Sequence, residues 1–138
     1  MGTKMFGTNR NQTEANEKFR IHAHKLLGEF VRAIDKCDQQ ELKGQFDVSE
    51  ALAEEILEII REYHPREKFS LGIAPLESAF STEKSTRPNI ELFEMNDRNK
   101  WGAECVLWVN GNPSEPILHV EFFEQASDLK LQYKYIGS

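Results

Sequence analysis

The sequence of 138 residues has few of the side chains that build disulfide frameworks or metal sites. Its two cysteines, Cys37 and Cys105, form no CxxC motif and no cysteine and histidine set with metal-ligand spacing. Both fall on apolar faces of predicted elements, so we expect two buried free thiols that act as small hydrophobic residues. The sequence therefore predicts no disulfide, no metal ion and no cofactor, which suits a reducing cytoplasm.

Long apolar runs and clusters of basic residues are also missing. No run approaches the roughly 20 residues of a membrane-spanning helix, and the polar segment 1–12 lacks the apolar core of a secretory signal. The densest basic stretch, Lys130 to Lys134, has only two lysines and the formal net charge is −6, so we expect neither nucleic acid nor membrane as a partner. We expect a cytoplasmic protein with a disordered segment 1–12 and a single α+β domain over 13–138.

The common catalytic templates are absent as well, including GxSxG, the P-loop, GxGxxG and HExxH. One histidine, His119, shares a predicted sheet face with the carboxylates of Glu104 and Glu121. A histidine beside a glutamate can act as a general base, but a polar cross-strand cluster neutralised by Lys130 or Lys134 is commoner. We therefore treat His119, Glu121 and Glu104 as a candidate polar site, which favours a protein without catalytic activity and leaves an enzyme open as the alternative.

Two amphipathic helices are predicted in the first half of the chain. Residues 13–37 place apolar side chains at the 3.6-residue spacing of a helix, with mixed charges on the opposite side. A capping box at Asp47-Val48-Ser49-Glu50 begins a second long helix that should end before Pro65. Between them, Asp38 to Glu41 begins a helical turn that Gly44 can end.

The exposed side of the second long helix is strongly acidic. Its glutamates are Glu50, Glu54, Glu55, Glu58 and Glu62. They form either an ordinary solvated helix face or a docking surface for a basic partner.

The second half loses the helical period and predicts an antiparallel sheet. A short strand over 69–73 and a polar connection over 75–88 are followed by strand-like runs. These runs are 90–95, 101–109, 117–123 and 129–136. Asn110-Gly111-Asn112-Pro113 predicts a turn between the second and third runs. Helices followed by strands indicate an α+β fold, with two N-terminal helices packed on a C-terminal antiparallel sheet of four to five strands.

Alternation along the strands predicts an inner face under the helices and an outer face on the opposite side. The inner face comprises Trp101, Ala103, Cys105, Leu107, Val109, Leu118, Val120, Phe122, Leu129, Leu131, Tyr133 and Tyr135. The outer face comprises Glu104, Val106, Trp108, Ile117, His119, Glu121, Phe123, Lys130, Gln132, Lys134 and Ile136.

The outer face is only half polar, which is unusual for a surface left in water. We expect its apolar side chains, Trp108, Val106, Ile117 and Phe123, to form an interface. The cover is the connection 75–88, a second copy of the chain or another protein, and we favour a homodimer.

Two resemblances add to these expectations. The stretch Phe30 to Asp38, followed by Leu42 and Phe46, resembles the opening of NTF2-like (cystatin-like) domains. That resemblance implies a curved antiparallel sheet around the long helix, used for ligand binding, isomerase or dehydratase chemistry, toxin neutralisation or dimerisation. The layout of two helices followed by Trp101 and Leu107-Trp108 resembles small bacterial domains of unknown function over residues 26–136.

The sequence leaves two functions open. The first is a non-catalytic protein-binding module, of regulatory or immunity type, that acts through the acidic helix or the outer face. The second is a small-molecule-binding protein or an isomerase or dehydratase-type enzyme, with a pocket between the long helix and the sheet lined by Trp101, Tyr133 and Tyr135. A closed interior favours the first, whereas an apolar cavity of roughly several hundred cubic ångströms with converging polar groups favours the second.

Overall fold

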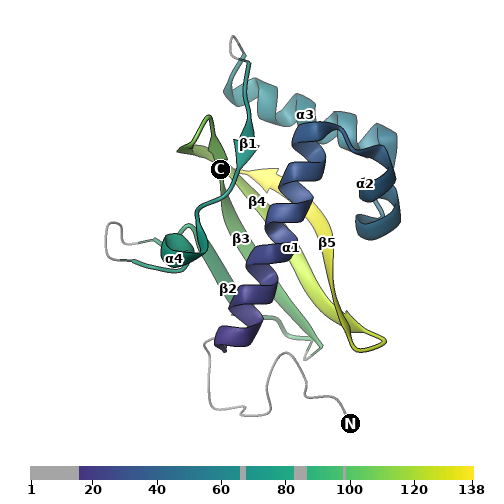
Figure 1. Ribbon diagram of the computed structural model, residues 1–138, viewed down its shortest axis with the longest axis vertical. Helices are drawn as coiled ribbons and strands as arrows, with labels where there is room; N and C mark the ends of the chain where they lie inside the picture. Colours follow the sequence, from purple (N-terminus) through teal and green to yellow (C-terminus); the bar gives the residue numbers. More distant parts are fainter. Residues whose placement is uncertain (1–15, 66–67, 83–86, 98) are drawn as a thin grey trace.

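The structure, a computed structural model, describes residues 16–65, 68–82, 87–97 and 99–138. Its elements are α1 (Glu17–Lys36), α2 (Gln39–Phe46), α3 (Glu50–Tyr63), β1 (Leu71–Gly72), α4 (Leu76–Ala79), β2 (Ile90–Glu94), β3 (Lys100–Val109), β4 (Asn112–Gln125) and β5 (Asp128–Gly137). Helix α1 lies across one face of an antiparallel sheet (Figure 1). The predicted α+β fold is confirmed, while the expected disordered segment 1–12 lies outside the described residues.

The boundary between α2 and α3 differs from the predicted one. Helix α2 continues past Gly44 because Phe46 is buried in the core, and it ends at Asp47, whose φ is 55°. Ser49 caps α3, since its hydroxyl oxygen accepts a hydrogen bond from the Leu52 amide at 3.1 Å. Asp47 therefore ends one helix and does not begin the next.

The sheet is ordered around β3. Strands β1 and β2 pair with the two ends of the same edge of β3, and β4 and β5 follow on its other side. The predicted turn between β3 and β4 is confirmed, because Asn110 and Gly111 both have positive φ values, as a two-residue hairpin requires. Ala126 and Ser127 make the β4–β5 turn with positive φ values too, without the glycine that usually marks such turns.

The core lies between α1 and the inner face of the sheet. Phe19 of α1 contacts the rings of Trp101 and Phe122 edge to face, with centroid distances of 5.2 and 5.7 Å. Further along the helix, Phe30 contacts Phe46 of α2 at 5.2 Å. Every inner-face residue predicted on β3 and β4 is buried. The predicted inner face is therefore confirmed for these two strands.

Strand β5 departs from the predicted alternation. Two consecutive residues of β4 pair with Tyr135 and Tyr133, which leaves Lys134 as an extra residue in a β-bulge. The bulge turns the following side chains over. Tyr135, predicted on the inner face, lies on the outer face and is 55% exposed, and Ile136, predicted on the outer face, packs against the core.

The connection 75–88 packs on the helix side of the molecule over residues 76–80, although Arg87 near its end forms an ion pair with Glu104 of β3. It contains α4, where Ala79 is fully buried, and the guanidinium of Arg20 on α1 lies 5.5 Å from the centre of the Phe80 ring. Just before it, His24 of α1 is 2.8 Å from the carbonyl oxygen of Ala74. Residues 74–80 therefore anchor the connection to α1 and do not cover the outer face.

Candidate functional site

The outer face of the sheet carries the residues that the sequence analysis singled out. Val106 lies opposite Ile117 on the neighbouring strand, and Trp108 follows at the same end of the face. The Trp108 indole N–H donates a hydrogen bond to the side-chain oxygen of Asn89 at 3.0 Å, which fixes the ring. Phe123 lies at the other end of β4, so the structure brings three of the four predicted interface residues together and leaves Phe123 apart from them.

A polar row crosses the middle of the outer face. The strand pairing places Glu91 of β2 beside Glu104 of β3, Glu104 beside His119 of β4, and His119 beside Tyr135 of β5. The rings of His119 and Tyr135 are stacked, with centroids 4.1 Å apart and planes inclined by 10°. Arg87, which precedes β2, forms an ion pair with Glu104. The row therefore changes from carboxylates on β2 and β3 to hydrogen-bond donors on β4 and β5.

Glu121, the third residue of the candidate polar site, lies between two lysines. Its carboxylate oxygens are 3.6 Å from Lys100 Nζ and 3.7 Å from Lys134 Nζ, and the side chain is 13% exposed. The predicted partner Lys134 is therefore present, whereas Lys100 was missed because it precedes the strand predicted from 101. Since Glu104 and Glu121 are each paired with cations, the site is a cross-strand charge network and not an isolated acid and base pair.

Phe93 is an exposed aromatic residue of the outer face that the sequence analysis did not assign. It lies on β2 beside Gly102 of β3, and a methyl group added at Gly102 would overlap the Phe93 ring. Glycine therefore leaves room for the Phe93 ring above β3, as in other sheets where an aromatic side chain covers a strand glycine. Phe93 remains 38% exposed, which adds a second aromatic side chain to the accessible part of this face.

Comparison with known proteins assigns a family. A family model described as a domain of unknown function, DUF7668, matches residues 31–137, more than half of the chain. The chain belongs to DUF7668. The match confirms the resemblance to small domains of unknown function, and the NTF2-like resemblance stays a prediction. Neither the curated proteins nor the solved structures gave a match. The matched range contains all five strands, so the outer face is part of the DUF7668 domain itself.

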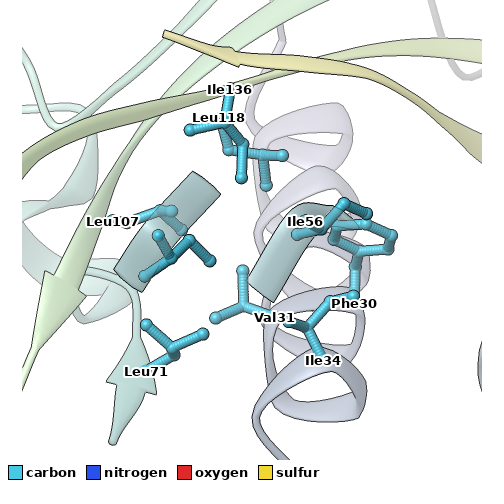
Figure 2. A pocket seen from close by; sticks show the side chains of 9 residues that line it. Phe30, Val31, Ile34, Ile56, Leu71, Leu107, Leu118 and Ile136 are labelled. Carbon is cyan, nitrogen blue, oxygen red and sulfur yellow. The ribbon is translucent and has the colours of Figure 1, made fainter. Parts of the chain in front are cut away.

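The interior of the DUF7668 domain contains a small cavity between α1, α3 and the sheet. Its volume is about 10 Å³, close to that of a single water molecule. Figure 2 shows that apolar side chains surround it. The lining residues are Phe30, Val31, Ile34, Ile56, Ile60, Leu71, Leu107, Leu118 and Ile136. A cavity of this size and lining has neither the room nor the polar groups that a small-molecule site requires.

The three aromatic residues predicted to line a pocket have other positions. Trp101 is buried against Phe19, and Tyr133 is stacked on Phe30 with centroids 5.9 Å apart. Tyr135 is on the outer face. Trp101 and Tyr133 therefore fill the space between α1 and the sheet, and the predicted pocket does not form from these residues.

The two cysteines are both free but differ in burial. Cys105 is fully buried, and this burial raises the pKa of its thiol to about 12. Cys37, also predicted to be buried, is exposed because it ends α1 with a φ of 53°, which turns it away from the apolar stripe of the helix.

In residues 16–65, 68–82, 87–97 and 99–138, no three histidine, cysteine, aspartate or glutamate side chains are grouped to hold a metal ion. Among the helices within the same ranges, none has the length and apolar character to cross a membrane.

Proposed function

We propose that this DUF7668 domain is a non-catalytic protein-binding module, of regulatory or immunity type, that binds its partner with the outer face of the sheet. The observation that carries the proposal is the composition of that face. Its centre is a charge network, and around it Val106, Trp108, Phe93 and Tyr135 remain partly or largely exposed. Exposed aromatic residues beside ordered polar groups are typical of protein interfaces.

The energetic gain from covering this face is substantial. Burying one large apolar side chain contributes about 1.5–3 kcal/mol, and aromatic residues commonly provide the main anchors of a protein interface. Trp108 suits such a role because its hydrogen bond to Asn89 already fixes the ring, so little conformational entropy is lost on binding.

The acidic side of α3 supports binding less well. Its glutamates are exposed, and Glu58 is paired with Arg61 of the same helix at 3.4 Å. A charged helix face without apolar anchors affects the rate of encounter more than the affinity of a complex. The outer face combines anchors with charge and is therefore the better candidate.

The proposal is tested by placing a photoreactive amino acid at Gln132, an exposed outer-face position on β5. Glu54, exposed on α3, provides the matched control position. After irradiation in cells that make the protein, we expect Gln132 to form a covalent adduct with a protein that mass spectrometry identifies. Adducts from Glu54 alone, or none from either position, would contradict the proposal.

A further inference from the structure

We infer that the partner at the outer face is a second copy of this chain, related by a twofold axis that runs parallel to the strands between β3 and β4. The inference rests on the proposed function of the outer face. Self-association is favoured because the side chains of the outer face complement one another when the face is rotated onto itself.

The strand register supplies the geometry. On the outer face, β3 and β4 side chains lie side by side at five levels. From one end of the sheet to the other, the pairs are Lys100 with Phe123, Gly102 with Glu121, Glu104 with His119, Val106 with Ile117, and Trp108 with Pro113. A twofold rotation about an axis parallel to the strands exchanges β3 and β4 but keeps each level. Each β3 residue therefore faces the β4 residue of its own level in the second copy.

The middle level is complementary under this rotation. Glu104 faces His119 of the second copy, and the symmetry repeats the contact, so two carboxylates each meet an imidazole. At the flanks of the same level, Glu91 of β2 faces Tyr135 on β5 of the second copy, where the phenol hydroxyl can donate to the carboxylate. The acceptor half of the polar row therefore lies on the donor half of the second copy.

The neighbouring levels are complementary as well. Val106 faces Ile117 of the second copy, which buries two β-branched apolar side chains against each other. At one end, the Lys100 side chain, whose ammonium is paired with Glu121 of its own copy, packs its methylene groups on the Phe123 ring of the second copy. Packed sheets are inclined by about 30°, so the match is closest at the central levels, Glu104 with His119 and Val106 with Ile117.

The other twofold arrangement of the same face is unfavourable. If the axis runs along the polar row, perpendicular to the strands, each strand lies over the same strand of the second copy. Glu91 then meets Glu91, and Glu104 meets Glu104 with the Arg87 of each copy beside it. Like charges brought together in an interface cost several kcal/mol, roughly a hundredfold or more in affinity. The charge pattern therefore selects the axis parallel to the strands.

The available area is enough for such a contact. Four strand positions about 4.8 Å apart and eight residue steps of about 3.3 Å give a face of roughly 500 Å² per copy. Two copies bury roughly 1,000 Å² in total, which is the lower bound for a specific interface. We therefore expect a reversible dimer whose population depends on concentration.

A charge exchange between two variants tests the partner and the axis together. In a Glu104→Lys dimer each introduced lysine faces His119, and in a His119→Glu dimer each introduced glutamate faces Glu104. We expect each variant alone to dimerise at least about tenfold more weakly than the wild type. When the two variants are mixed, the heterodimer has one contact between the introduced lysine and the introduced glutamate. The second contact, related to the first by the twofold axis, keeps Glu104 with His119. Native mass spectrometry should then detect the heterodimer in excess over both homodimers.

Two controls accompany the experiment. Glu54→Lys makes the same charge reversal on α3 and should leave wild-type dimerisation unchanged. Circular dichroism melts report whether each variant is folded. Should Glu104→Lys prove unfolded, Glu104→Gln replaces it, because the amide keeps the shape of the side chain; its dimer should be weaker than the wild-type dimer, and an unchanged affinity would overturn the inference.

The outcomes separate this inference from the proposed function. A wild type that stays monomeric at every concentration overturns the second copy as partner, while an adduct between Gln132 and a different protein would leave the proposed function standing. A dimeric wild type whose two charge variants fail to form heterodimers overturns the axis. A wild type that stays monomeric and forms no adduct at Gln132 would contradict both the second copy as partner and the proposed binding function of the outer face.

Discussion

Single charged residues on the outer face are stabilised by neighbours that come from other strands. Glu121 on β4 lies between Lys100 on β3 and Lys134 on β5, and Glu104 on β3 is paired with Arg87. These contacts hold the charges in fixed positions before any partner arrives. A preorganised charge pattern favours specific binding because the side chains lose little freedom on association.

The Cys105 thiol gives the fold a defined response to alkali. Burial raises the pKa of Cys105 from 9.0 to about 12, so the folded state keeps a proton that the unfolded state releases above about pH 9. Between these values the unfolded state binds fewer protons, and the free energy of unfolding therefore falls as the pH rises. The pKa of Tyr133 is also raised, by burial and then by Glu55, which acts in the same direction above pH 10.

We expect denaturant melts to show a loss of stability between about pH 8 and about pH 10.5, and Cys105→Ala to lose less over the same range. The alanine variant is the matched control because it keeps Tyr133 and removes only the thiol. Equal losses in the two proteins would show that Cys105 does not set the response.

The difference between the two cysteines shows where residue-level prediction ends. Both were expected to be buried because both follow an apolar pattern. Cys105 is buried as its strand alternation predicts, but Cys37 ends α1 and adopts a positive φ, which the helical period of the preceding residues does not encode. Burial at the last position of an element depends on how the chain leaves the element.

Among the elements, β5 contains a bulge that changes which of its side chains face the core. Lys134 is the extra residue that brings Ile136 onto the core and Tyr135 onto His119. Deleting Lys134 removes the extra residue, so the shortened strand alternates regularly with Tyr133 inward, Tyr135 outward and Ile136 inward. We therefore expect the free energy of unfolding to change by less than about 1 kcal/mol, whereas turning Ile136 out of the core would cost about 1.5–3 kcal/mol.

Lys134→Ala is the matched control for this deletion. It removes the ion pair with Glu121 but keeps the register, and the lysine is exposed, so a change below about 0.5 kcal/mol is expected in the same melts. A deletion variant less stable than Lys134→Ala by about 1.5–3 kcal/mol would show that Lys134 belongs to the regular alternation and is not the extra residue.

Alternation predicted the faces of β3 and β4 because their paired segments keep one register through the centre of the sheet. It failed in β5 because one inserted residue reverses every side chain after it, and no turn residue marks the insertion. The α2–α3 boundary failed for a related reason. Asp47 and Ser49 are both good capping residues, and the choice between them depends on how far the packing of Phe46 extends α2.

At the scale of the whole molecule, the order of helices and strands was enough to predict two layers. One layer is α1 with its neighbouring helices, and the other is the sheet (Figure 1). The side on which the connection 75–88 packs was not predictable, because it depends on contacts such as Arg20 with Phe80 between distant segments. Residues 74–80 therefore do not cover the outer face, and the function proposed for the domain depends on the exposure of its described side chains.

Self-association through the outer face can be measured by sedimentation of the wild type and of Trp108→Glu over a range of concentrations. Trp108 lies beside Val106 and Ile117 at the apolar end of the face, so a charge there opposes burial of the interface. We expect the wild type to associate as its concentration rises and Trp108→Glu to sediment as a folded monomer. A wild type that remains monomeric, or a folded variant that associates with unchanged affinity, would show that the outer face does not bind a second copy.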